Sequence, residues 1–237
     1  MDWPGECAVV IPCFNEATAI APVVRGVLTY LPCVLVVDDG STDGTAEVAT
    51  AAGAQVMRQA ENRGKGAALA LGWQQAHAQG FGWALCLDGD GQHNPHEIPA
   101  FLVCAARTRA DLVIGNRFHN GPPSMPPLRR AVNCWMSRRL SERTGLALPD
   151  TQCGYRLLRL DLLPRLDLGT QRFEIESEVL VAVLQAGGRV EFIPVRAHAA
   201  STRSKIRPVR DAWRWLRWWR AGHGGLRPSQ PLRSHGN

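Results

Sequence analysis

Short apolar runs alternate with helix-patterned stretches along the first half of the chain. The runs have strand length and are bounded by polar turn residues, so they predict strands. Five strands are expected, over residues 7–12, 34–37, 54–58, 82–87 and 111–115. Helices are expected between them, at about 17–30, 42–52, 66–78 and 96–108, with Ser41 or Thr42 as the cap of the second. This alternation predicts an α/β domain in which helices cover both faces of a parallel sheet.

The second half of the chain is less regular. A proline-rich loop is expected at 119–127, and a basic helix at 128–144. The pattern then predicts a strand led by residues 150–156, a helix over 174–185, a strand at 189–195 and a polar loop at 198–207. Acidic residues lie near the start of the 174–185 helix, where the helix dipole favours them. We see no domain boundary before residue 208, so residues 1–207 are expected to form one domain.

Polar clusters follow four of the predicted strands. They are Asn15 with Glu16, Asp38 with Asp39, Asp88 with Asp90, and Asn116 with Arg117. In open α/β sheets, ligands bind outside the carboxyl ends of the strands. The agreement of four strand ends therefore predicts a binding site at this edge. For Glu16 a helix N-terminal role remains open, as does a turn or helix-cap role for Asp38.

The segment Asp88-Gly89-Asp90-Gly91-Gln92 concentrates charge where a buried strand ends. Two carboxylates one residue apart repel each other unless a cation lies beside them. A hard divalent ion such as Mg²⁺ or Mn²⁺ suits carboxylates combined with substrate phosphates. A turn rich in Asp and Gly is the alternative. His93 and His96 lie nearby, but their spacing fits no metal site, and we expect loop histidines.

The composition is that of an ordinary globular chain of 237 residues with 45% hydrophobic content. Its net charge of +6 favours anionic partners. The seven cysteines include no CxxC pair, so reduced thiols in a cytosolic protein are expected. Neither a signal-peptide pattern nor an apolar run of about 20 residues occurs, so any membrane contact is expected to be peripheral.

A basic, tryptophan-rich stretch over residues 208–221 is the other prominent feature. At helical spacing it places five apolar residues on one face: Val209, Ala212, Trp215, Leu216 and Trp219. Arg210, Arg214 and Arg217 lie opposite. Two interpretations stay open: an interfacial helix drawn to anionic lipid, or a helix that packs on the domain. The residues beyond it, 222–237, are rich in Gly, Pro, Ser and Arg and are expected to be disordered.

Taken together, the motifs resemble those of family 2 glycosyltransferases with the GT-A fold, especially the dolichyl- and undecaprenyl-phosphate sugar synthases. The resemblance spans about residues 7–210. It rests on the segments 10–16 (VIPCFNE), 37–45 (VDDGSTDGT), 62–66 (NRGKG), 87–92 (LDGDGQ), 115–117 (GNR), 150–156 (DTQCGYR) and 204–207 (SKIR). It implies a mostly parallel, Rossmann-like sheet and the use of a nucleotide-sugar donor.

The resemblance also implies roles for residues at the strand ends. Donor-site residues would be Pro12, Phe14 and Glu16 around the base and ribose, Asp39 reading either group, and Lys65 close by. Asp90 would ligate Mg²⁺ or Mn²⁺ with the Gln92 carbonyl, and Asp88 would contact the ribose or a metal-bound water. The metal would stabilise the leaving diphosphate.

Basic residues would hold the remaining phosphates. Arg117 and Arg129 or Arg130 would bind an acceptor phosphate, and Arg203 and Lys205 would close over the donor diphosphate. The other arginines of the basic helix, Arg138, Arg139 and Arg143, are expected to face solvent.

We therefore expect an inverting, metal-dependent transferase that moves a sugar to a polyprenyl phosphate at the cytosolic membrane face. Inversion is implied by the resemblance. A hydroxyl acceptor is the alternative, and it needs a base, for which Glu176 and Asp150 are the candidates. A third interpretation is a non-catalytic protein that binds nucleic acid through residues 203–220 or docks a protein partner. No nucleic-acid-binding motif occurs, so no nucleic-acid partner is expected, and the retained Asp88, Asp90 and Gln92 argue against a protein that has lost catalysis.

Overall fold

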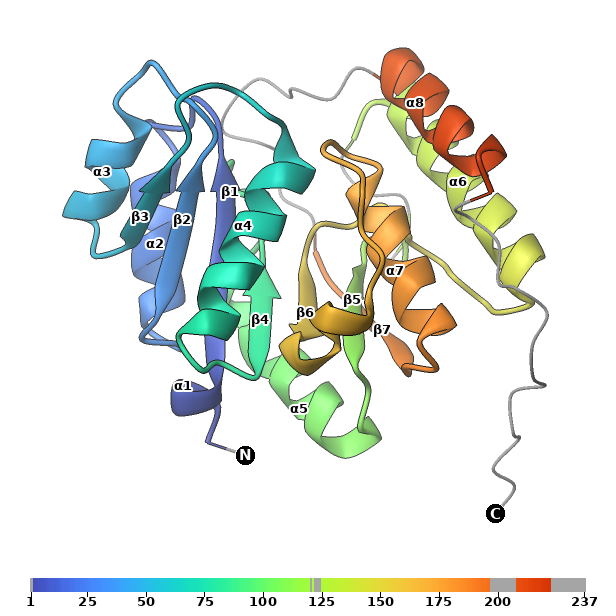
Figure 1. Cartoon of the computed structure of the whole chain (residues 1–237), viewed down its shortest axis with the longest axis horizontal. Coiled ribbons are helices and arrows are strands. Elements are labelled where there is room, and N and C mark those ends of the chain that lie inside the picture. Colours follow the sequence, from blue (N-terminus) through green and yellow to red (C-terminus); the bar gives the residue numbers. More distant parts are fainter. Residues whose placement is uncertain (1, 120, 122–124, 197–207, 223–237) are drawn as a thin grey trace.

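A computed structural model describes residues 2–119, 121, 125–196 and 208–222 (Figure 1). Arg203, Lys205 and nearly all of the 222–237 tail lie outside the described residues, so the expectations for them stay predictions.

The fold is built on a seven-stranded sheet with helices around it (Figure 1). Its strands are β1 (Cys7–Cys13), β2 (Val34–Asp38), β3 (Gln55–Arg58), β4 (Trp83–Cys86), β5 (Leu112–Asn116), β6 (Arg156–Arg159) and β7 (Val190–Pro194), in the spatial order β3-β2-β1-β4-β6-β5-β7. Neighbouring strands are parallel, except that β6 runs antiparallel to both β4 and β5. The expectation of a mostly parallel α/β sheet of the GT-A type is confirmed.

Helices lie on both faces of the sheet. They are α1 (Trp3–Glu6), α2 (Ile20–Leu28), α3 (Thr45–Ala51), α4 (Lys65–Ala78), α5 (Ile98–Thr108), α6 (Pro127–Thr144), α7 (Ile175–Gln185) and α8 (Pro208–Arg220), with 3-10 turns η1 (Pro95–Glu97) and η2 (Leu160–Arg165). In Figure 1, α4 and α7 lie in front of the sheet and α5 lies behind it. Five of the seven cysteines are buried, and all seven are free thiols.

The turn after β2 differs from the prediction. Neither Ser41 nor Thr42 caps the next helix, which begins only at Thr45 after Gly44 at φ 82°. Instead, the Ser41 backbone N–H donates to Asp38 at 2.9 Å, and the Ser41 hydroxyl accepts from the Asn15 backbone N–H at 2.8 Å. Asp38 is fully buried in this turn, so of its two possible roles the structure shows the turn role.

The C-terminal helix α8 packs on the domain beside α6 (Figure 1). Trp215 is 1% exposed, and its indole N–H donates to the Ser177 hydroxyl at 2.8 Å. The predicted apolar face is confirmed at Trp215, and Ala212 and Trp219 pack against the core. The buried side is nevertheless rotated from the predicted one, because Asp211 and Trp218 lie inside whereas Val209 is 70% exposed. The apolar pattern assumed an apolar interior, whereas α8 covers a cavity lined by polar residues.

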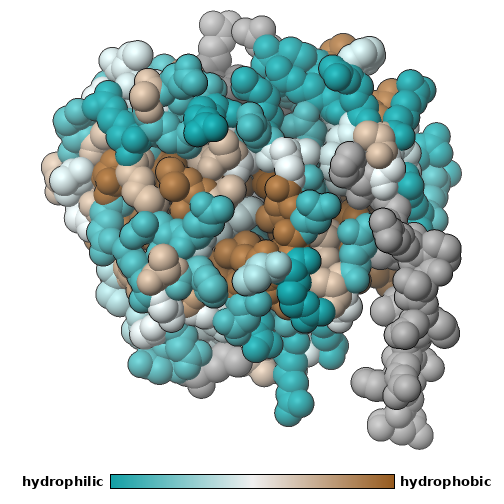
Figure 2. All heavy atoms as spheres, viewed as in Figure 1, coloured by the Kyte–Doolittle hydropathy of each residue, from teal (hydrophilic) through white to brown (hydrophobic). Residues whose placement is uncertain are grey.

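The surface seen in Figure 2 is a mosaic of polar and hydrophobic residues. Within the described ranges, every helix is too short or too polar to cross a bilayer.

Candidate active site

Two adjoining cavities open at the carboxyl ends of β1, β2 and β4. The larger has a volume of about 420 Å³ and the smaller about 60 Å³. Both are lined by Lys65, Asp88, Gln92, Arg129 and Phe173, so the two share one boundary. The larger lies in the range typical of small-molecule sites.

Residues from the first half of the chain form one side of the larger cavity. Pro12 and Phe14 line it, together with four acids that we call the acidic wall: Glu16, Asp39, Asp88 and Asp90. Together with Lys65, these are the described residues that were predicted to contact the donor, whereas Arg203 and Lys205 lie outside the described ranges. Asp39 accepts backbone N–H groups from Arg63 at 2.7 Å and Gly64 at 2.8 Å, which fixes the loop before α4. Burial raises the pKa of Asp39 against the opposing effect of these bonds.

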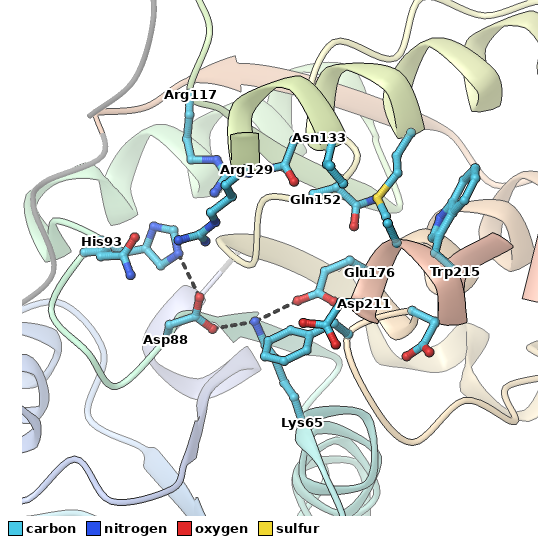
Figure 3. Close-up of a pocket in the computed structure, with 16 residues that line it drawn as sticks. Lys65, Asp88, His93, Arg117, Arg129, Asn133, Gln152, Glu176, Asp211 and Trp215 are labelled. Atoms are coloured by element: carbon cyan, nitrogen blue, oxygen red, sulfur yellow. Dashed lines mark ion pairs between the residues drawn. The ribbon is translucent and has the colours of Figure 1, made fainter. Parts of the chain in front are cut away.

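Lys65 joins the two cavities through a buried charge cluster (Figure 3). Its ammonium lies 2.5 Å from Asp88 Oδ1 and 2.7 Å from Glu176 Oε1. His93 Nε2 lies 3.4 Å from the other oxygen of Asp88. Burial favours neutral Asp88, but Lys65 and His93 outweigh it and hold the pKa of Asp88 well below its usual range. Asp88 is therefore an oriented anion that contacts the ammonium of Lys65 and the ring of His93.

The cluster fits only because residue 154 is a glycine. A Cβ there would lie 2.7 Å from Lys65 Nζ and 3.0 Å from both Asp88 oxygens. The motif segment 150–156 therefore contributes space, as well as side chains, to the site.

Asp90 and Gln92 fit a divalent cation by the nature of their ligand atoms. Both line the larger cavity, and the Gln92 side-chain amide bonds the Asp90 carboxylate. The Gln92 backbone N–H donates to the same carboxylate at 3.0 Å. No group of three or more His, Cys, Asp or Glu residues within the described ranges is arranged to hold a metal ion by itself. In nucleotide sites Mg²⁺ is commonly held by only one or two protein ligands, which leaves coordination positions for oxygens of the substrate.

The smaller cavity has a cationic side. Arg117 donates from Nε and Nη2 to Asp150, each at 2.8 Å, in a buried bidentate pair. Arg129 lines both cavities, and its buried Nε has no hydrogen-bond partner among the described residues. Burial and the nearby charge of Arg117 lower the pKa of Arg129, so an anion between them would be stabilised. Arg130 lines neither cavity.

The ion pair of Arg117 with Asp150 also affects which residue could act as the general base for a hydroxyl acceptor. Asp150 is fully buried against Arg117 and lines neither cavity. Glu176 lines the smaller cavity, and its Oε2 has no hydrogen-bond partner among the described residues.

Sequence reasoning missed several residues of the site. His93 was expected to be a loop histidine with no part in the site, but it contacts Asp88, is 4% exposed and packs against Tyr155 with ring centroids 5.0 Å apart. His96 is exposed in the 3-10 turn η1, and its ring shares a hydrogen bond of 2.6 Å with the Tyr30 hydroxyl. Beyond α6, three arginines line the larger cavity: Arg172, Arg210 and Arg214. We call them, with Arg129, the arginine wall. The net positive charge was the signal for an anionic ligand, but it did not indicate these positions.

Comparisons with known proteins agree with this architecture. The model of the family described as Glycosyl transferase family 2 matches residues 8–166. Glycosyltransferase AglJ of Haloferax volcanii is 32% identical over 89% of this chain and 70% of its own length. Undecaprenyl-phosphate mannosyltransferase of Micrococcus luteus is 30% identical over 78% of this chain and 81% of its own.

A solved structure shows the same fold. Glucosyl-3-phosphoglycerate synthase from Mycobacterium tuberculosis, crystallised with Mn²⁺, UDP-glucose and phosphoglyceric acid, superposes with a TM-score of 0.75. The match covers 94% of this chain and 81% of that one, at 20% identity. On the family match and these relatives, the chain belongs to glycosyltransferase family 2 and is a glycosyltransferase.

Proposed function

We propose that this enzyme transfers one sugar, with inversion, from a nucleotide-diphosphate sugar to a polyprenyl phosphate. The reaction would need Mg²⁺ or Mn²⁺ and would take place at the cytosolic face of a membrane. The observation that carries the proposal is the pair of adjoining cavities, one with an acidic wall and one with Arg117 and Arg129. One cavity would hold the donor and the other an anionic acceptor, and the two cavities meet at Lys65 and Asp88.

The larger cavity would hold the donor. Pro12 and Phe14 offer apolar contact to a base, and Glu16 and Asp39 offer carboxylate acceptors for its N–H groups or for ribose hydroxyls. Asp90 and Gln92 would hold the divalent cation, which neutralises charge on the diphosphate as it leaves. Asp88, which is paired with Lys65, would accept a hydrogen bond from a hydroxyl of the donor.

The smaller cavity would hold the acceptor phosphate. Arg129 offers a buried N–H donor, and Asp150 engages Nε and Nη2 of Arg117 but not Nη1. A phosphate oxygen is already anionic near neutral pH, so it can attack without a general base. The name of the Micrococcus luteus relative supports this choice of acceptor.

A hydroxyl acceptor is the second candidate, and Glu176 is the observation in its favour. Its buried Oε2 lies in the smaller cavity, where it could take a proton. Against it, Lys65 lies 2.7 Å from the other oxygen of Glu176 and stabilises the ionised form, which weakens the base.

Association with a membrane would use the outer sides of α6 and α8. Exposed apolar side chains occur seven residues apart on α6, at Leu128 and Trp135, and four apart on α8, at Val209 and Trp213. Each spacing places its pair on one face of a helix. Arginines on the same helices would attract anionic lipid.

The test offers the purified chain labelled UDP- and GDP-hexoses with either a short polyprenyl phosphate or the matching polyprenol. We expect a lipid-linked sugar from the phosphate alone. Product from the polyprenol alone would establish the hydroxyl reaction instead. A matched Glu176→Gln variant separates the two further: it would abolish transfer to a hydroxyl, whereas transfer to a phosphate would survive.

A further inference from the structure

We infer that α8 is part of the donor site: Arg210 and Arg214 bind the diphosphate of the nucleotide. This inference rests on the proposed use of a nucleotide-diphosphate donor. It gives a binding role to a helix that lies outside the family match, which ends at residue 166.

The position of the two arginines is the first argument. Both line the larger cavity, which also contains Pro12, Asp39 and Asp90, and neither lines the smaller cavity. Residues four apart on a helix project from the same face, with Cβ atoms about 6 Å apart. The two guanidinium groups can therefore converge on one ligand.

The packing of α8 holds them there. Its inner side inserts Asp211 and Trp215 beside the smaller cavity (Figure 3). The bond from Trp215 to Ser177 and the contact of its ring with Trp135, at 5.3 Å between centroids, fix the rotation of the helix. With Trp215 inside, Arg210 and Arg214 must lie on the flank that turns toward the larger cavity.

Charge is the second argument. A diphosphate cannot lie against four carboxylates unless cations face it from the other side. Lys65 does not fill this role alone, because Asp88 and Glu176 already surround its ammonium. The arginine wall supplies cations in addition to the divalent ion proposed at Asp90 and Gln92, and a guanidinium matches phosphate oxygens with two parallel N–H groups.

Asp211 attracts the side chains of Arg210 and Arg214 without forming hydrogen bonds to them. Its Oδ1 lies 3.8 Å from Arg210 Nε and 3.6 Å from Arg214 Nη1. Both distances are too long for hydrogen bonds, so Asp211 attracts the guanidinium groups but does not occupy these N–H donors. The side chains are 47% and 31% exposed, which leaves them accessible to an entering ligand.

The test is calorimetric titration of the full chain with UDP and GDP in the presence of Mn²⁺, repeated with UMP and GMP. Arg210→Gln and Arg214→Gln, singly and combined, are compared with Arg217→Gln, which removes one positive charge, as each single variant does, from an exposed position that lines neither cavity. Loss of about tenfold in affinity per arginine is expected for the diphosphate, and under about threefold for the monophosphate. Arg217→Gln should bind like the wild type. The affinity of Arg214→Lys for the diphosphate should lie between those of the wild type and Arg214→Gln, because lysine keeps the positive charge but lacks the two parallel N–H groups of a guanidinium.

Each of the following results would overturn the inference. Binding of the diphosphate by the double variant within threefold of wild type would do so and would leave the proposed function intact. Equal losses for diphosphate and monophosphate, or an equal loss for Arg217→Gln, would show a structural or general charge effect. In sedimentation of the same variants with anionic vesicles, a loss confined to vesicle binding would assign the arginines to lipid headgroups. Failure of the wild type to bind any nucleotide would refute the proposed function as well.

Discussion

The acidic wall and the arginine wall both line the larger cavity, yet they are held in different ways. Asp39 is fixed by two backbone N–H groups, and Asp88 by Lys65 and His93. Among the described residues, Arg210 and Arg214 lie at long ion-pair distances from Asp211, Arg214 also lies near the charge of Glu174, and both side chains remain partly exposed. One wall is therefore preorganised by the protein, whereas the other can adjust to an anionic ligand.

Substitutions that remove a cation from the two walls should therefore differ in their effects on stability and on binding. Removing a cation from the acidic wall leaves buried carboxylates unpaired and should reduce the stability of the fold. Removing a cation from the arginine side should leave the fold intact and weaken binding. The predictions below test this division.

Lys65→Met should produce the largest change. It leaves Asp88 and Glu176 without their shared cation, which should lower the free energy of unfolding by about 3–5 kcal/mol near pH 8. Urea denaturation measures this. The matched control is Arg189→Met, which removes a surface pair with Glu191 and should cost less than about 1 kcal/mol.

The pH dependence of this variant has a defined sign. In the wild type the folded-state pKa of Asp88 lies below its unfolded value, so its contribution is present above that value and is lost only in strong acid. Without Lys65, burial raises the pKa of Asp88, and the folded state binds more protons than the unfolded chain. The difference in stability from wild type should shrink as the pH falls from 8 to 5. An unchanged difference would refute the assigned charge cluster.

Arg129→Gln should leave stability nearly unchanged and raise the KM for polyprenyl phosphate by about tenfold to a hundredfold. The reason is the loss of a buried N–H donor beside Arg117. Steady-state rates with both substrates varied measure it. Arg130→Gln is the control, since Arg130 lines neither cavity. A larger effect from Arg130 than from Arg129 would reverse this assignment of the acceptor phosphate.

Trp213→Ala should give the smallest change, about a fivefold loss of binding to anionic vesicles without loss of nucleotide binding. Trp213 is 63% exposed on the outer side of α8. Vesicle sedimentation is the assay, and Val103→Ala, which removes an exposed apolar side chain from α5, is the control. Equal binding by both variants and wild type would exclude Trp213 from the membrane contact.

The two walls also differ in how far the sequence predicted them. Each acid of the acidic wall follows a strand or its turn, so the strand pattern and the motifs together located Glu16, Asp39, Asp88 and Asp90. Their partners were harder to predict. Lys65 and Glu176 are 111 residues apart, and only the packing of α4 and α7 on one face of the sheet brings them together.

Apart from Arg129, the arginine wall could not be located from local pattern. Arg172 lies in a loop, and the reach of α8 depends on which of its sides is buried. The apolar pattern placed Val209 on the same face as Trp215, whereas Val209 is 70% exposed and the polar Asp211 is buried in its place. The hydrogen bond of Trp215 to Ser177 helps to fix this orientation. Whether a helix packs over polar or apolar residues depends on the tertiary structure, and the hydrophobic periodicity of the helix does not predict it.

The most direct test of the central claim is formation of a lipid-linked sugar by the wild type and by Asp90→Asn, with Mn²⁺ and with a chelator. The proposal predicts product from the wild type only when the metal is present, and a rate lower by about a hundredfold or more for the variant. Metal-independent transfer, or an Asp90→Asn variant as active as the wild type, would contradict the proposed donor site.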